Sequence, residues 1–250
     1  MSDFNRGYAR SIPADRADMS VDAGLRSFML GVYNKVALGL VLSAALAYVT
    51  GQVEPVQQLL YRVTTDGRLV GYTLLGYVVA FGPLAVILFG AFGMKNATPR
   101  SSGIYYWTIV SLLGASLGAI TLMYTGASIF QTFLITATAF GGLSLVGYTT
   151  KKDLSPMGSF LIVGAIGLMV AMVVNIFVAS SMLYFIINVV GVLIFAGLIA
   201  YDTQRLKMTY YELGGNQTAL GVATNYGALS LYLDFINMFT SLLSLFGSRE

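Results

Sequence analysis

The sequence predicts an all-α integral membrane protein with seven transmembrane helices. Of its 250 residues, 56% are hydrophobic and only 10% are charged, whereas soluble domains carry roughly 25% charged residues. The apolar residues gather in seven runs of roughly 20 residues, the length that an α-helix needs to cross about 30 Å of hydrocarbon. The 28 glycines and 5 prolines favour helices whose backbones pack closely together.

Two regions follow from this pattern. Residues 1–27 are polar with charges of both signs, and we expect them to form a flexible cytoplasmic tail. Residues 28–246 form the predicted transmembrane domain. Its helices are expected at about residues 28–50, 70–93, 103–124, 128–148, 157–178, 182–203 and 224–245.

The first three predicted helices have distinct features. The first apolar run is too long, and lies too far into the chain, to be the core of a signal peptide. Residues 51–69 contain several charged residues and are expected to form the longest loop of the first half. Pro83 lies within the second run, where the missing backbone donor predicts a kink. Gly114 and Gly118 in the third run have the small-xxx-small spacing of a packing face.

Short connections separate the remaining predicted helices. Residues 125–127 precede the fourth helix, and the basic turn 151–156 leads into the fifth. Residues 179–181 join the fifth helix to the sixth. A longer loop, with charged residues and glycines at 205–216, is expected before the seventh.

The distribution of Lys and Arg predicts the orientation. If the amino terminus is cytoplasmic, all of the 14 Lys and Arg residues except Arg62, Arg68 and Arg249 fall on the cytoplasmic side. Cytoplasmic loops of membrane proteins carry such an excess of positive charge. We therefore expect a cytoplasmic amino terminus and a carboxyl terminus on the other side, and we attribute the basic turns to topology rather than to nucleic-acid binding.

Two predicted helices each carry one aspartate. Asp202 lies near the cytoplasmic end of the sixth helix, and Asp234 lies in the seventh. An intramembrane carboxylate costs several kcal/mol and commonly marks an ion pathway or a proton relay. At 1.5 Å per residue, Asp234 would lie about 13 Å inside the membrane, so the two carboxylates are expected at depths that differ by several Å.

The seventh helix also has a polar face. Ser230, Asn237 and Ser241 recur with Asp234 at helical spacing, and Asn188 lies on a weaker polar face of the sixth helix. A polar seam on an otherwise apolar helix is expected to face other helices or water. This predicts a seventh helix at the centre of the bundle, although such a seam could also serve only to hold helices together.

The sequence contains neither cysteine nor histidine. Disulfides, thiol nucleophiles, haem ligation and the usual zinc sites are therefore excluded. Any response to pH has to come from carboxylates or from a chain terminus rather than from imidazole. We expect no cofactor and no enzymatic activity.

Four segments resemble bacterial members of the Bax inhibitor-1 (transmembrane Bax inhibitor motif) family. They are residues 26–33 (RSFMLGVY), 147–155 (GYTTKKDLS), 194–204 (IFAGLIAYDTQ) and 229–237 (LSLYLDFIN). The similarity extends over nearly the whole chain from Arg26 onward. It implies a seven-helix fold in the bacterial inner membrane, with the last helix surrounded by the other six.

The resemblance also implies a calcium leak that responds to pH. Asp202 and Asp234 match the family's cytoplasm-side pair, which would sense protons and contact calcium ions transiently as they pass. In relatives an arginine after the second helix can pair with the aspartate of the sixth helix; here the matching residue is Lys95, a point donor rather than a bidentate one. Some relatives also carry an acid inside the second helix, which this sequence lacks.

These observations lead to a pH-gated cation leak as the main hypothesis. Two carboxylates that share a site repel each other when both are ionised, so the pair is expected to titrate as a unit. Acidification would release Asp202 from Lys95 and allow a helix to move. Because calcium binds the same carboxylate oxygens, protons and calcium should compete.

Two other hypotheses remain open from the sequence. The protein could act without transport, as a membrane partner that modulates a protease or a stress-response protein through the tail of residues 1–27. It could also be an intramembrane aspartyl protease, which would use the two aspartates as general acid and base. That class typically carries Gly-x-Gly-Asp, whereas the residues here are Tyr232, Leu233 and Asp234.

Overall fold

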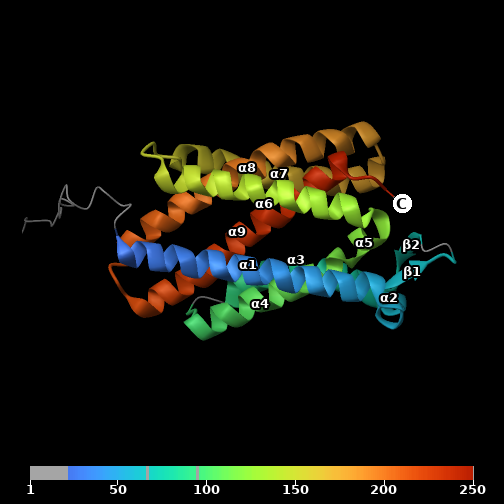
Figure 1. Ribbon diagram of the computed structural model, residues 1–250, viewed down its shortest axis with the longest axis horizontal. Coiled ribbons are helices and arrows are strands. Elements are labelled where there is room, and N and C mark those ends of the chain that lie inside the picture. Colours follow the sequence, from blue (N-terminus) through green and yellow to red (C-terminus); the bar gives the residue numbers. More distant parts are fainter. Residues whose placement is uncertain (1–21, 66–67, 94–95, 250) are drawn as a thin grey trace, which may run out of the picture.

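The structure is a computed structural model that describes residues 22–65, 68–93 and 96–249. It is a helical bundle with one β-hairpin in these parts of the chain (Figure 1). The elements, in chain order, are α1 (Ala23–Gln52), α2 (Glu54–Leu60), β1 (Tyr61–Val63), β2 (Leu69–Tyr72), α3 (Leu74–Gly93), α4 (Pro99–Ser116), the 3₁₀ turn η2 (Leu117–Ala119), α5 (Ile120–Met123), α6 (Gly126–Thr149), α7 (Ser155–Val178), α8 (Ser181–Glu212) and α9 (Gln217–Phe246).

The long helices run back and forth between two ends of the bundle. The first end holds the starts of α1 and α4 and the connections from α6 to α7 and from α8 to α9, and we call it the basic end. The second end holds α2, the antiparallel pair β1 and β2, and the end of α9, and we call it the hairpin end. The amino-terminal end of α1 and the carboxyl terminus therefore lie at opposite ends (Figure 1).

Polar side chains fix where most of the long helices begin. Asp22 accepts the backbone N–H groups of Gly24 and Leu25 at the start of α1. Thr98 forms a capping box with Ser101 before α4. Similar caps precede three later helices: Thr125 before α6, Ser180 before α8 and Asn216 before α9. Each cap satisfies donors that the first helical turn leaves unpaired.

Several predicted boundaries differ from the structure. Residues 23–27, predicted as part of a flexible tail, form the first turn of α1. The predicted loop 51–69 contains α2 and β1. The predicted loop 205–216 is mostly helix, because α8 continues to Glu212 and α9 begins at Gln217. Apolar runs locate the part of a helix that lies in hydrocarbon, whereas a helix continues into polar sequence as long as its backbone bonds are satisfied.

The helices have the length and composition of membrane spans. Among the described residues, six stretches of helix are long and apolar enough to cross a bilayer, and Leu74–Gly90 of α3 is a shorter apolar helix. Only 6% of the apolar window of α7 is buried within the protein, so this helix presents apolar side chains outward. The protein is therefore an all-α integral membrane protein, as predicted.

Helix α9 lies inside the bundle. Of its apolar window, 56% is buried, the largest share among these six stretches. Its main packing partners are α1, α4, α6 and α8, whereas α3 packs chiefly on α4, and α7 chiefly on α8. The prediction of a central seventh helix holds for its burial, but the helix packs mainly against four neighbours rather than six.

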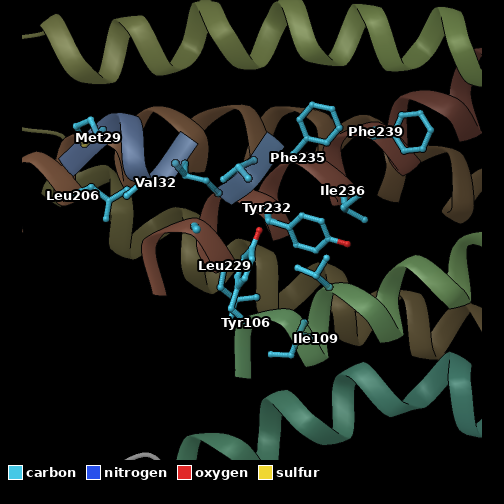
Figure 2. Packing of buried hydrophobic residues seen from close by; sticks show 14 of the residues in the cluster. Met29, Val32, Tyr106, Ile109, Leu206, Leu229, Tyr232, Phe235, Ile236 and Phe239 are labelled. Carbon is cyan, nitrogen blue, oxygen red and sulfur yellow. The ribbon is translucent and has the colours of Figure 1, made fainter. Parts of the chain in front are cut away.

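Aromatic residues of α9 form the core of the bundle (Figure 2). Tyr232 packs against Tyr106 of α4 with a ring separation of 6.4 Å, and its hydroxyl lies 2.7 Å from Ser43 Oγ of α1. Phe235 packs on Phe133 and Phe140 of α6. These contacts join α1, α4 and α6 to α9, and α8 packs on the opposite side of α9.

Candidate functional site

Asp202 of α8 and Asp234 of α9 face each other inside the bundle. Each residue is only 6% exposed, and their carboxyl groups are within hydrogen-bonding reach of each other. Asp202 lies opposite Ser230, and Asp234 lies one helical turn farther from the basic end. Four residues of helix correspond to about 6 Å along α9, and the difference in membrane depth that the sequence predicts stays a prediction.

Asp202 has three polar neighbours of different kinds. Ser230 Oγ donates to Asp202 Oδ2 over 2.5 Å, and Arg205 Nη1 lies 3.8 Å from Asp202 Oδ1. The side chain of Arg205 is 61% exposed, so solvent weakens this ion pair. The third neighbour is Asp234.

Asp234 has fewer hydrogen-bond partners than Asp202. Its Oδ2 atom is buried and has no hydrogen-bond partner. Two carboxyl groups can hydrogen-bond to each other only when one of them carries a proton. The contact between Asp202 and Asp234 is therefore a site that can hold a proton, and the adjacent oxygen of Asp234 can accept a further donor.

A small pocket leads from the basic end toward this pair. It has a volume of about 110 Å³ and lies between α8 and α9, lined by Asp202, Arg205, Leu206, Thr209, Ala223, Tyr226, Gly227 and Ser230. Since a water molecule takes up about 30 Å³ of the liquid, the pocket has room for a few waters or a small ion. It has no room for a peptide segment, which weakens the aspartyl protease hypothesis.

The predicted polar seam is divided between two places. Ser230 lies at the carboxyl pair, whereas Asn188, Asn237 and Ser241 line a second cavity of about 340 Å³ toward the hairpin end. This cavity is bounded by residues of α5, α7, α8 and α9 and also holds the hydrogen bond from Tyr184 to Ser244, of 2.9 Å. Asp234 lies between the two cavities along α9, about one turn from Ser230 and one turn from Asn237.

The structure identifies a partner of Asp202 that the sequence prediction missed. Arg205 was assigned to a loop, although its spacing of three from Asp202 places both on one face of a continuous helix. Lys95, the predicted partner, lies outside the described residues, and its role as a latch stays a prediction. The extension of α8 also brings Gln204 to the turn after α6, where its Nε2 donates to Lys152 O over 2.7 Å.

The site is poor in metal ligands. Within the described parts of the chain, no three acidic or other metal-ligating side chains come together. Calcium takes six to eight oxygen ligands, and the pair with Ser230 supplies only some of them. A calcium ion at this place would keep much of its water, which suits transient contact better than stable binding.

The fold and the site define a polytopic membrane protein with a buried acidic pair at the inner end of a small pocket. Comparison with known proteins identifies the family to which the chain belongs. It belongs to the Bax inhibitor family, because residues 25–250 match the family model described as "Inhibitor of apoptosis-promoting Bax1". The resemblance that the four sequence segments indicate is thereby confirmed.

Bacterial relatives match over nearly their full lengths. A protein of Caulobacter vibrioides is 67% identical over 250 residues, all of both chains. A protein of Rickettsia prowazekii is 38% identical, over 97% of this chain and 98% of the relative. The inner membrane protein YbhL of Escherichia coli is 37% identical, over 91% of this chain and 94% of the relative.

Proposed function

We propose that this protein is a pH-sensitive cation leak that conducts calcium, with Asp202 and Asp234 as its proton sensor. The observation that carries this proposal is the contact between the two carboxyl groups at the inner end of the pocket. Buried carboxyl groups inside a membrane domain are costly and accompany ion pathways or proton relays. The two cavities on either side of Asp234 support a path along α9.

The proposed gate depends on the charge of Asp202. When ionised, Asp202 attracts Arg205 on its own helix and accepts the hydroxyl of Ser230 on α9, so it ties α8 to α9. Protonation removes the charge and weakens both interactions. Acidification should therefore free α9 to shift and should increase the leak.

The proposed topology has seven crossings in the bacterial inner membrane, with the basic end in the cytoplasm. Helix α3 (Leu74–Gly93) is the proposed additional crossing, since 20 residues at 1.5 Å each reach about 30 Å. Lys151, Lys152, Arg205 and Lys207 gather at the basic end, which supports this orientation. The pocket beside the carboxyl pair would then be reached from the cytoplasm.

The test is calcium flux into proteoliposomes loaded with an indicator dye, between about pH 6 and pH 8. We expect the flux of the wild-type protein to rise several-fold toward the acidic end. Asp202→Asn and Asp234→Asn should remove most of this pH dependence, because an amide does not titrate. Lys95→Ala tests the predicted latch, and a change in the pH profile would support it.

Asp153 provides a matched control for these variants. It is an exposed carboxylate in the turn between α6 and α7, and hydrogen bonds from the backbone and side chain of Ser155 hold its pKa below its usual range. It therefore stays ionised throughout the tested range, and Asp153→Asn should leave the pH profile unchanged. A leak that falls as the pH drops would contradict the proposed gate. Folded protein without flux at any pH would contradict the leak itself and would favour an interaction protein.

A further inference from the structure

A groove lies between α1 and α6, and it shares no lining residue with the pocket beside Asp202. Its volume is about 550 Å³, and it is lined by Arg26, Met29, Leu30, Tyr33, Phe140, Gly141, Ser144, Leu145 and Tyr148. The two helices that form its walls extend alongside each other in Figure 1. Leu30 and Leu145 on its walls are 50% and 63% exposed, so the groove opens on the surface that faces lipid.

The deeper part of the groove has the shape and chemistry of a site for a hydrocarbon chain. A Cβ atom placed on Gly141 would meet no heavy atom within 4 Å, so the glycine leaves open space in the wall. Phe140 lies beside it and packs on Phe235 of α9, with ring centroids 5.6 Å apart. The interior of the protein therefore closes the back of the groove with aromatic carbon.

Ser144 is an unpartnered donor in the middle of the groove. It is 6% exposed, and its Oγ atom has no hydrogen-bond partner. Hydroxyl groups inside helices usually bond to the carbonyl one turn earlier, and Thr136, Thr138 and Thr149 of the same helix do so. The hydroxyl of Ser144 is thus left to bind a group that enters the groove.

The basic end of the groove carries a cation. Arg26, in the first turn of α1, is exposed, and no carboxylate of the described residues lies within ion-pair distance of it. Asp22, one turn earlier, is engaged by the N–H groups of Gly24 and Leu25. Lys151 and Lys152 follow α6 at the same end and are also exposed. This end of the groove therefore attracts anions.

We propose that the groove binds one anionic phospholipid. Its phosphate would lie at Arg26, a glycerol ester carbonyl would accept the hydroxyl of Ser144 one turn deeper than Tyr148, and an acyl chain would cover Phe140 and Gly141. This order of groups, from charge to ester to hydrocarbon, is the order in which a lipid lies in its leaflet. Basic pockets between transmembrane helices bind anionic headgroups in this way. The proposal does not depend on the calcium leak.

The test uses purified full-length protein exchanged into detergent with defined lipid, and native mass spectrometry to count the lipid that it retains. We expect retention of phosphatidylglycerol in preference to phosphatidylcholine. Arg26→Gln should lower the retention of phosphatidylglycerol about fivefold, the effect of one basic residue near a membrane surface. Gly141→Leu should lower the retention of both lipids, because its side chain would fill the space for the acyl chain. Ser144→Ala should also reduce retention.

Two neighbouring variants serve as matched controls. Gly142→Leu places the same side chain one residue away, also with no atom within 4 Å of its Cβ position, but outside the groove lining. Arg100→Gln removes an exposed arginine at the start of α4, at the same end of the bundle. Both should retain lipid like the wild type. Equal retention of the two lipids by the wild type, or full retention by Gly141→Leu, would overturn the proposal. A change of oligomeric state in Gly141→Leu without lipid loss would also overturn it and would assign the groove to a second copy of this chain.

Discussion

At the scale of single residues, the three neighbours of Asp202 should contribute unequally to its titration. The hydroxyl of Ser230 makes a short bond in a protected place, and hydrogen bonds to charged groups contribute about 1.5–3 kcal/mol. The distance from Arg205 to Asp202 is longer, and the Arg205 side chain is largely exposed. Such exposed ion pairs contribute about 0–1 kcal/mol. Ser230 should therefore stabilise the ionised carboxylate more than Arg205 does.

This difference predicts how the pH response moves in two variants. Removing a donor from the ionised form favours the protonated form, so the midpoint of calcium flux should move to higher pH in both. For Ser230→Ala we expect a shift of about one to two pH units, since one unit corresponds to about 1.4 kcal/mol. For Arg205→Gln we expect less than about 0.7 unit. The measurement is the flux midpoint in proteoliposomes; a larger shift in Arg205→Gln would show that the ion pair, not the hydroxyl, holds the carboxylate.

At the scale of helices, sequence patterns predicted where helices lie but not where they end. The predicted bounds of the helices at 128–148 and 157–178 lie close to those of α6 and α7. At the start of α6 the cap Thr125 lies next to the apolar run. Residues 205–212 are polar and were assigned to a loop, yet they extend α8. This extension places Arg205 beside Asp202 and Gln204 at the turn after α6. Hydropathy could not predict this extension of α8, because it detects the segment that lies in hydrocarbon rather than the full length of the helix.

The sequence predicted the two acidic residues of the candidate site but not the arrangement of the residues around them. Asp202 and Asp234 stand out because carboxylates are rare in apolar helices, and the spacing of Ser230 from Asp234 placed it on the same seam. Periodicity alone could not show that Ser230 bonds to Asp202 while Asn237 and Ser241 face another cavity. That division depends on the angle and register between α7, α8 and α9, which are set by contacts between distant segments.

One such contact is the close approach of α6 to α8. A Cβ atom on Gly147 would lie 2.2 Å from the carbonyl oxygen of Ala200, a backbone atom that cannot rotate away. Gly147→Ala should therefore push the helices apart and destabilise the protein by about 1–3 kcal/mol, the usual cost of overpacking. Because Ala200 lies two residues before Asp202, we also expect an altered pH profile of flux.

The measurement for Gly147→Ala is the thermal unfolding midpoint in detergent. Gly142→Ala is the matched control, since its Cβ would meet nothing within 4 Å. Alanine is favoured over glycine in helices by about 1 kcal/mol, so the control should be neutral or slightly more stable. Equal midpoints for the two variants would show that the contact between α6 and α8 adjusts without cost.

At the scale of the whole molecule, the two ends of the bundle differ in charge and in the chain terminus they hold. The start of α1 lies at the basic end, where Phe28 packs on Tyr210 of α8 with ring centroids 5.7 Å apart. The end of α9 lies at the hairpin end, where Thr125 N–H donates to Ser248 O over 3.0 Å. A chain that enters at one end and leaves at the other crosses the bundle an odd number of times. The six long helical stretches and α3 together give such an odd number of passages along the bundle.

This geometry predicts that the two ends of the chain lie on opposite sides of the membrane. Green fluorescent protein fused after Glu250 should remain dark when exported, and alkaline phosphatase at the same place should be active, because it needs the oxidising periplasm. The same reporters inserted in the basic turn at Lys152 should give the reverse result and act as an internal reference. A fluorescent fusion after Glu250 would place both ends in the cytoplasm. That result would contradict the proposed seven crossings, because the start of α1 and the end of α9 lie at opposite ends of the bundle.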